Sequence, residues 1–341
     1  MIMHARTRVF LLVFLAWFML PGNPARALEN QPQKSWEKIC ERVINVPFPS
    51  GDRPSSKDAK TLNKCSSYDL YYGFGQPANP EKARLCAYDE MDKARVDGPF
   101  DGEAMLMTIY ANGVGAKRNF DLAIKLACKI GGAPAEIEGR VKHLEELKEQ
   151  NWQGTGFSLC DDITSGYMAG FCADHVNKFA SRGREKQLDK IQSKWTGAEK
   201  REYAILRRAA TQYFDIHAEN EVDQSGTARA ALSIDDTSSQ EKAFIKTLEM
   251  LEQGRLPNYS HQQLRDADSR LNSVYQKIQK TSEPPSGTVT KESIRTTQRG
   301  WLKYRDAWVR FCEKKYSGCS SDSIKTHLTL KRIKELEAFL N

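Results

Sequence analysis

Polar residues suited to recognition gather in one stretch, residues 293–312, which reads S-I-R-T-T-Q-R-G-W-L-K-Y-R-D-A-W-V-R-F-C. Its apolar residues recur at helical intervals and predict one broad stripe on a helix of roughly five turns. Gln298, Arg305 and Asp306 lie on or beside this stripe, where polar groups must be hydrogen-bonded or partly solvated. One interpretation is a core helix with an internal Arg305–Asp306 pair, because charges beside a core are usually paired.

A recognition surface is the second interpretation of the same stretch. Trp and Arg are over-represented among the residues that carry binding energy at interfaces. On this reading the stripe and its polar neighbours also contact a partner. The candidate binding residues are Gln298, Trp301, Tyr304, Arg305 and Asp306.

Residues that could perform catalysis are scattered along the chain. No metalloprotease, nucleophile-elbow, P-loop or dinucleotide-binding motif is present. His217 has no Ser, Cys or carboxylate companion at a meaningful spacing, so we predict a structural histidine. His143 lies among alternating charges, which at helical spacing usually face water. We therefore expect no enzymatic activity, no catalytic residue and no cofactor.

Eight cysteines, an even number, favour disulfides in an exported protein. The short-range candidates are Cys160–Cys172 and Cys312–Cys319, the latter because Gly318 supplies a turn. A zinc site at Cys160, Cys172 and His175 is the alternative, but its C-x11-C-x2-H spacing fits no common finger, so we expect no metal. The sequence leaves open how the other four pair: Cys40, Cys65, Cys86 and Cys128.

The beginning of the chain predicts export. Residues 1–27 combine a basic start at Arg6 and Arg8, an apolar run over 9–20, and a small-x-small cleavage signal at 25–27. The apolar run is too short to span a bilayer comfortably, so we expect a cleaved signal peptide and no membrane anchor afterwards. The mature protein is then expected to be soluble, in the periplasm of a bacterial envelope or secreted.

The composition narrows the class of partner. Forty per cent apolar and 28% charged residues are ordinary for a soluble globular protein. Removing Arg6, Arg8 and Arg26 with the signal peptide lowers the formal charge from +7 to +4. Nucleic-acid binding would require a clustered basic face, and no dense basic run is present. We expect a protein partner and no nucleic acid.

Helical periodicity extends through the chain and predicts an all-α fold. Two early blocks, 68–87 and 104–127, each read as helix, tight turn, helix, and they match at a shift of 40 residues. The matching positions are Gly73 with Gly113, Gly75 with Gly115, and Ala83 with Ala123. These blocks resemble Sel1-like repeats. That resemblance implies a concave protein-interaction surface, although two repeats can also be a structural cap.

Further helices follow these blocks, separated by turn-rich segments. Residues 136–150, 199–220 and 240–253 are predicted helices, with a loop at 221–239. A long helical stretch after Cys172 has Val176 and Phe179 among its apolar markers, and we expect Gly183 and Gly197 to interrupt it. Ser260 and Gln263 form a capping box that begins the next helix.

Two motifs in this C-terminal part carry a second resemblance. A-D-S-R-L-N-S-V-Y at 267–275 is followed by Q-R-x-W-x-x-Y-R-D at 298–306. Together they resemble the LprI-type lysozyme-inhibitor domain, a small helical domain of bacterial envelope proteins. Residues 160–172 resemble the opening of the same family, in which two such cysteines are tied together. The segment after them is interpreted as a diverged copy, in which Tyr213, His217 and Ala218 replace the Trp, Arg and Asp.

These interpretations combine into an expected organisation. Residues 1–27 are the signal peptide, 28–150 the Sel1-like repeats, 151–255 the degenerate LprI-like domain and 256–341 the clearer LprI-like domain. The fold expected is all-α, with αα repeats followed by two small disulfide-braced helical bundles. The resemblance implies a protein-binding module that inhibits lysozyme by covering the cleft where two carboxylates act. The alternative is a periplasmic interaction scaffold without inhibitory activity.

Overall fold

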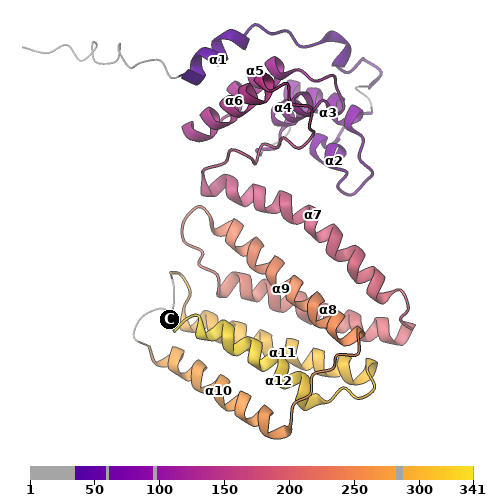
Figure 1. Cartoon of the computed structure of the whole chain (residues 1–341), viewed down its shortest axis with the longest axis vertical. Helices are drawn as coiled ribbons and strands as arrows, with labels where there is room; N and C mark the ends of the chain where they lie inside the picture. The colour runs from indigo at the N-terminus through magenta and orange to yellow at the C-terminus, as the bar shows by residue number, and fades with distance from the viewer. Residues whose placement is uncertain (1–34, 59–60, 95–97, 282–286, 341) are drawn as a thin grey trace, which may run out of the picture.

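The computed structural model describes residues 35–58, 61–94, 98–281 and 287–340, and these are built from α-helices without a β-strand (Figure 1). The predicted all-α class is therefore confirmed. The predicted signal peptide, residues 1–27, lies outside the described residues. None of the helices in the described part of the chain is long and apolar enough to cross a membrane.

Short helices form the N-terminal region. They are α1 (Ser35–Val43), the 3-10 helix η2 (Ser50–Asp52), α2 (Ser67–Tyr72), α3 (Pro80–Lys93), α4 (Gly102–Asn112), α5 (Phe120–Lys129) and α6 (Pro134–Glu149). From α2 to α6 each helix packs against the next, and α1 lies against α5 and α6. Their core is almost fully enclosed, because the apolar side chains of α4 and α5 are buried on nearly every face.

The two blocks that match at a shift of 40 residues have the same local geometry. Gly73 ends α2 and Gly113 ends α4, both with left-handed backbone at φ 70° and 64°. Asn79 and Asn119 then cap α3 and α5, and their backbone amides donate to Leu70 and Tyr110 carbonyls at 2.8 and 3.0 Å. Each pair of helices is thus closed by an equivalent turn. The assignment of these pairs to Sel1-like repeats stays a prediction.

Long helices form the C-terminal region. They are α7 (Gly166–Gln192), α8 (Gly197–Asn220), α9 (Arg229–Glu252), α10 (His261–Lys280), α11 (Lys291–Lys315) and α12 (Ser321–Glu337). They pack in the spatial order α7, α9, α8, α11, α12, α10. One apolar cluster runs continuously from Leu188 to Leu336 through this stack. The two predicted helical bundles therefore share a single core, while their exact boundaries stay a prediction.

Two details of the predicted helices are wrong. The expected loop at 221–239 ends early, because α9 already begins at Arg229. Polar residues in its first half are stabilised by tertiary contacts: Ser238 accepts a hydrogen bond from Arg184 of α7 at 3.2 Å, and Asp236 contacts His217 of α8 at 2.8 Å. Gly183 does not interrupt α7, which is continuous. A single exposed glycine costs a helix only about 1 kcal/mol, which the packing of α7 on α9 offsets.

All eight cysteines are paired. The predicted Cys160–Cys172 and Cys312–Cys319 bonds are confirmed, and the pairs that the sequence left open are Cys40–Cys128 and Cys65–Cys86. Because Cys160 and Cys172 are bonded to each other, the zinc alternative with His175 is wrong. Disulfides of this density fit a protein of an oxidising, extracytoplasmic compartment.

The two regions meet along α7. His175, which is buried, hydrogen-bonds through Nδ1 to the Tyr68 hydroxyl at 2.9 Å, and Arg182 donates to the Tyr72 and Gly73 carbonyls. Phe179, expected in the core of the C-terminal region, is 43% exposed and packs instead against aromatic rings of the N-terminal region. Val176 is also exposed, whereas Leu188 and Trp195, further along the same stretch, are buried in the C-terminal core.

Candidate functional site

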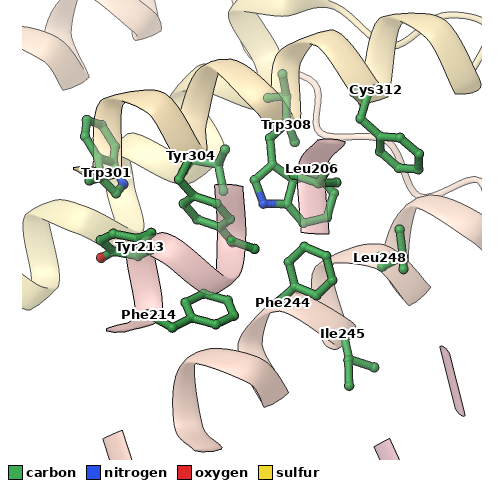
Figure 2. Packing of buried hydrophobic residues seen from close by; sticks show 14 of the residues in the cluster. Leu206, Tyr213, Phe214, Phe244, Ile245, Leu248, Trp301, Tyr304, Trp308 and Cys312 are labelled. Atoms are coloured by element: carbon green, nitrogen blue, oxygen red, sulfur yellow. The ribbon is translucent and has the colours of Figure 1, made fainter. Parts of the chain in front are cut away.

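The inward face of α11 is the centre of the C-terminal core, as the stripe predicted. Figure 2 shows Tyr304 and Trp308 pointing from α11 toward side chains of α8 and α9. Trp301 is only 2% exposed, and Tyr304, 8% exposed, stacks on Tyr213 with ring centroids 5.0 Å apart. These two members of the predicted binding set are core residues in this structure. They support a surface from beneath and do not form it.

Arg305 has a partner, but not the predicted one. Its Nη1 lies 3.2 Å from Oδ1 of Asp268 on α10 and 3.3 Å from the Thr329 hydroxyl on α12. The guanidinium also lies over the Trp301 ring, 4.9 Å from its centroid, a favourable cation–π geometry. Asp306 is exposed. The expected Arg305–Asp306 pair is wrong because adjacent residues on a helix do not face each other.

Gln298 connects α11 to a buried charge cluster on α8 and α12. Its side-chain oxygen accepts from Nε of Arg332 at 3.0 Å. Arg332 forms a two-pronged salt bridge with Glu221, at 2.8 and 2.5 Å, and both side chains are completely buried. Glu335 adds a third acceptor at 3.0 Å. Two buried charges are tolerated here because nearly every hydrogen-bonding position is occupied.

His217 extends this cluster to α9. Its Nδ1 lies 2.8 Å from Asp236 and its Nε2 lies 3.2 Å from Glu221. Burial alone lowers the pKa of His217, but the hydrogen bonds to Asp236 and Glu221 outweigh burial and raise it to about 9. Burial likewise raises the pKa of Glu221, but Arg332 and His217 lower it to about 2. The expectation that His217 lacks a carboxylate companion is wrong, because Glu221 lies four residues later on the same face and Asp236 reaches it from α9. Its structural role stays a prediction.

A groove lies on the outer side of Arg305, between α10 and α11. Its volume is about 360 Å³, and we name it the α10–α11 groove. Its lining residues are Asp268, Leu271, Asn272, Tyr275, Arg295, Gln298, Arg299, Leu302 and Arg305. All of them except Arg295 belong to the motifs at 267–275 and 298–306. The two sequence motifs therefore meet in space as the two walls of one depression.

The walls are held by contacts that the core provides. Leu271 and Val274 anchor α10 from below, while the Ser260–Gln263 capping box fixes its first turn. Across the floor, the Arg305–Asp268 ion pair links the two helices. Leu302 is 40% exposed on the α11 wall. An apolar side chain surrounded by amide, hydroxyl and guanidinium groups matches the apolar centre and polar rim of protein–protein interfaces.

Other candidate groups belong to the scaffold. His143, expected to face water, is partly buried with Nδ1 2.9 Å from Asp162, because α6 is covered by the segment that leads into α7. Among the described residues, one group has donor atoms close enough for a metal ion, namely Cys65, Cys86 and Glu90. Its two sulfurs are bonded to each other, so they are not thiolate ligands.

Asp268 and Arg332 were not predicted as site residues, although each is a charged residue at a position of the sequence that borders or lies within an apolar helical stripe. Asp268 follows Leu264 by four positions and precedes Leu271 by three, so it borders the buried stripe of α10. Arg332 lies midway between Leu328 and Leu336, which are four residues away on either side, within the buried stripe of α12. A charge at such a position requires a partner. The identity of that partner depends on the tertiary fold.

Comparison with protein families agrees with the C-terminal resemblance. Residues 246–336 match a family model described as "Lysozyme inhibitor LprI". The match begins within α9, ends near the end of α12, and contains both walls of the α10–α11 groove. No curated protein and no solved structure matches the chain. The match supports one copy of the domain, while the diverged copy at 151–255 stays a prediction.

Proposed function

We propose that this protein binds another protein through the α10–α11 groove, and that the partner is a lysozyme whose substrate cleft it covers. One observation carries the proposal: the two motifs within the matched segment, 267–275 and 298–306, form opposite walls of the same groove. The cystine-braced scaffold fits a protein that works in the envelope or outside the cell, and the periplasm is our proposed location.

The rigidity of the groove favours binding. Arg305 is fixed by Asp268, Thr329 and the Trp301 ring, so little side-chain freedom is lost when a partner docks. Leu302 offers apolar area next to these fixed polar groups. Complete burial of a leucine side chain contributes about 1.5–3 kcal/mol relative to leaving it exposed. The proposed inhibition is steric, because a folded domain bound over the cleft prevents peptidoglycan from reaching the two carboxylates that hydrolyse it.

Substitution of Leu302 tests the groove directly. Leu302→Asp places a charge where the proposed interface is apolar, and we expect the affinity for lysozyme to fall about tenfold or more. Titration calorimetry with purified c-, g- and i-type lysozymes measures the affinity, and a cell-wall turbidity assay measures inhibition.

Leu232→Asp is the matched control. Leu232 is an equally exposed leucine, at 46%, but it lies on α9, outside the groove. This variant should bind and inhibit like the natural protein. Equal loss of affinity in both variants, or none in Leu302→Asp, would contradict the proposed site. Failure of the natural protein to bind any lysozyme class would contradict the lysozyme proposal itself.

A further inference from the structure

The outer edge of α11 is a ridge between two depressions. On one side lies the α10–α11 groove, and on the other lies a depression of about 550 Å³ between α8 and α11. Arg299 lines both of them, so it stands on the ridge, and Lys303, one turn further along, lines the second. We call Arg299 and Lys303 the α11 crest. Both are exposed.

The crest carries positive charge that the protein itself does not neutralise. Arg295 beside it is paired with Glu292, and Arg305 is paired with Asp268. Arg299 and Lys303 have no ion pair or hydrogen-bond partner among the described residues. Asp215 is the one acidic residue that lines the second depression. Unpaired cations on a projecting edge are available to an acidic partner without first breaking an internal contact.

A lysozyme active site contains acidic groups with which these cations can pair. Glycoside hydrolysis uses a pair of carboxyl groups that flank the scissile bond at the bottom of a cleft. We propose that the α11 crest enters this cleft and that Arg299 and Lys303 pair with the two catalytic carboxylates. The depressions on either side of the ridge then receive the lips of the cleft. This inference rests on the proposed function and specifies how the cleft is covered.

Charge pairing also gives the complex a defined pH dependence. One of the two lysozyme carboxyl groups is a general acid whose pKa is raised to about 6 by its apolar surroundings. It pairs with a cation only when ionised. Binding by the crest therefore strengthens as the pH rises from 5 to 7, and it removes the protonated form that catalysis requires. An inhibitor that only blocked access would show no such coupling to this ionisation.

The test reverses the charge of the crest in the full-length protein. Arg299→Glu combined with Lys303→Glu should weaken binding to a c-type lysozyme at least tenfold at pH 7 and should abolish the pH dependence. Lys186→Glu combined with Lys190→Glu is the control, since these α7 lysines are exposed and have the same four-residue spacing. The control pair should change affinity less than twofold. Circular dichroism and thermal unfolding check that each variant is folded.

A variant of the lysozyme provides the second arm. Replacing its general acid with Gln should remove the pH dependence of binding by the natural protein, and charge reversal of the crest should then cost less affinity. If the crest variant keeps its affinity while Leu302→Asp loses it, the crest inference is overturned and the proposed function stands. If the natural protein binds no lysozyme, both are overturned.

Discussion

At the scale of single residues, the Arg332–Glu221 pair is the most sensitive point of the C-terminal core. Both charges are fully buried, and each is the main partner of the other. Removing one member of a buried pair leaves the other without compensation, which typically costs about 3–5 kcal/mol. The pair also joins α8 to α12, so its loss affects the helices that support α11.

Arg332→Met tests this role. We expect the free energy of unfolding, measured by urea titration, to fall by about 3–5 kcal/mol because Glu221 keeps a buried charge. Arg270→Met removes an exposed ion pair with Glu337 and is the control, with little expected change. If both variants lost a similar free energy of unfolding, burial of the Arg332–Glu221 pair would not increase the cost of removing one partner.

The raised pKa of His217 predicts that the protein becomes less stable at alkaline pH. Its pKa is about 9 in the folded protein and 6.5 in an unfolded chain, so the folded state binds its proton more tightly. Protonated His217 therefore stabilises the folded state. This stabilisation is fully present below pH 6.5 and is lost as the pH rises through about 9. We expect the stability advantage of the natural protein over His217→Asn to shrink by about 2–3 kcal/mol between pH 6 and pH 10. A constant difference over this range would contradict a charged His217.

At this scale, the sequence was sufficient to predict which residues of α11 are buried, because burial there follows the local spacing of apolar residues. The periodicity of 293–312 placed Ile294, Trp301 and Trp308 in the core, and all three are buried. The partner of Arg305 could not be predicted, because Asp268 lies 37 residues earlier in the sequence. Burial of Trp301 was one of two interpretations, and only the tertiary packing of α11 on α8 distinguishes them.

At the scale of elements, caps and turns were predictable and contacts between helices were not. Ser260 caps α10 as its capping box predicted, and Gly113 ends α4 in the left-handed conformation. The start of α9 at Arg229 was missed, since this part of the helix is rich in polar residues whose stabilising partners lie on α7 and α8. The disulfides show the same difference between local and long-range features. Only the two bonds between cysteines close in sequence could be predicted.

The separation of the paired cysteines predicts unequal contributions to stability. Cys40–Cys128 joins α1 to α5 across 88 positions, whereas Cys312–Cys319 spans seven. In the chain-entropy model their removal costs about 4.6 and about 2.4 kcal/mol, respectively. Replacing each pair by serines and comparing denaturant midpoints checks the order. A larger loss for the short loop would show that native packing outweighs chain entropy here.

At the scale of the whole molecule, one core connects α7 through α12, while the N-terminal region docks on α7 (Figure 1). The sequence predicted the class of fold and the N-terminal helix pairs. It could not predict that the two C-terminal helical units share a core, because the contact of α8 with α11 joins residues about a hundred positions apart. The α10–α11 groove exists only because this packing fixes α11.

Side-chain footprinting of a complex with lysozyme tests the central claim most directly. Hydroxyl radicals oxidise exposed side chains, so a bound partner protects those that it covers. We predict that a saturating c-type lysozyme protects Leu302 and Tyr275 in the α10–α11 groove while Tyr167, which is 63% exposed on α7, stays reactive. Protection confined to the N-terminal helix pairs, or no protection at Leu302 in a formed complex, would contradict the assignment of this groove as the binding site.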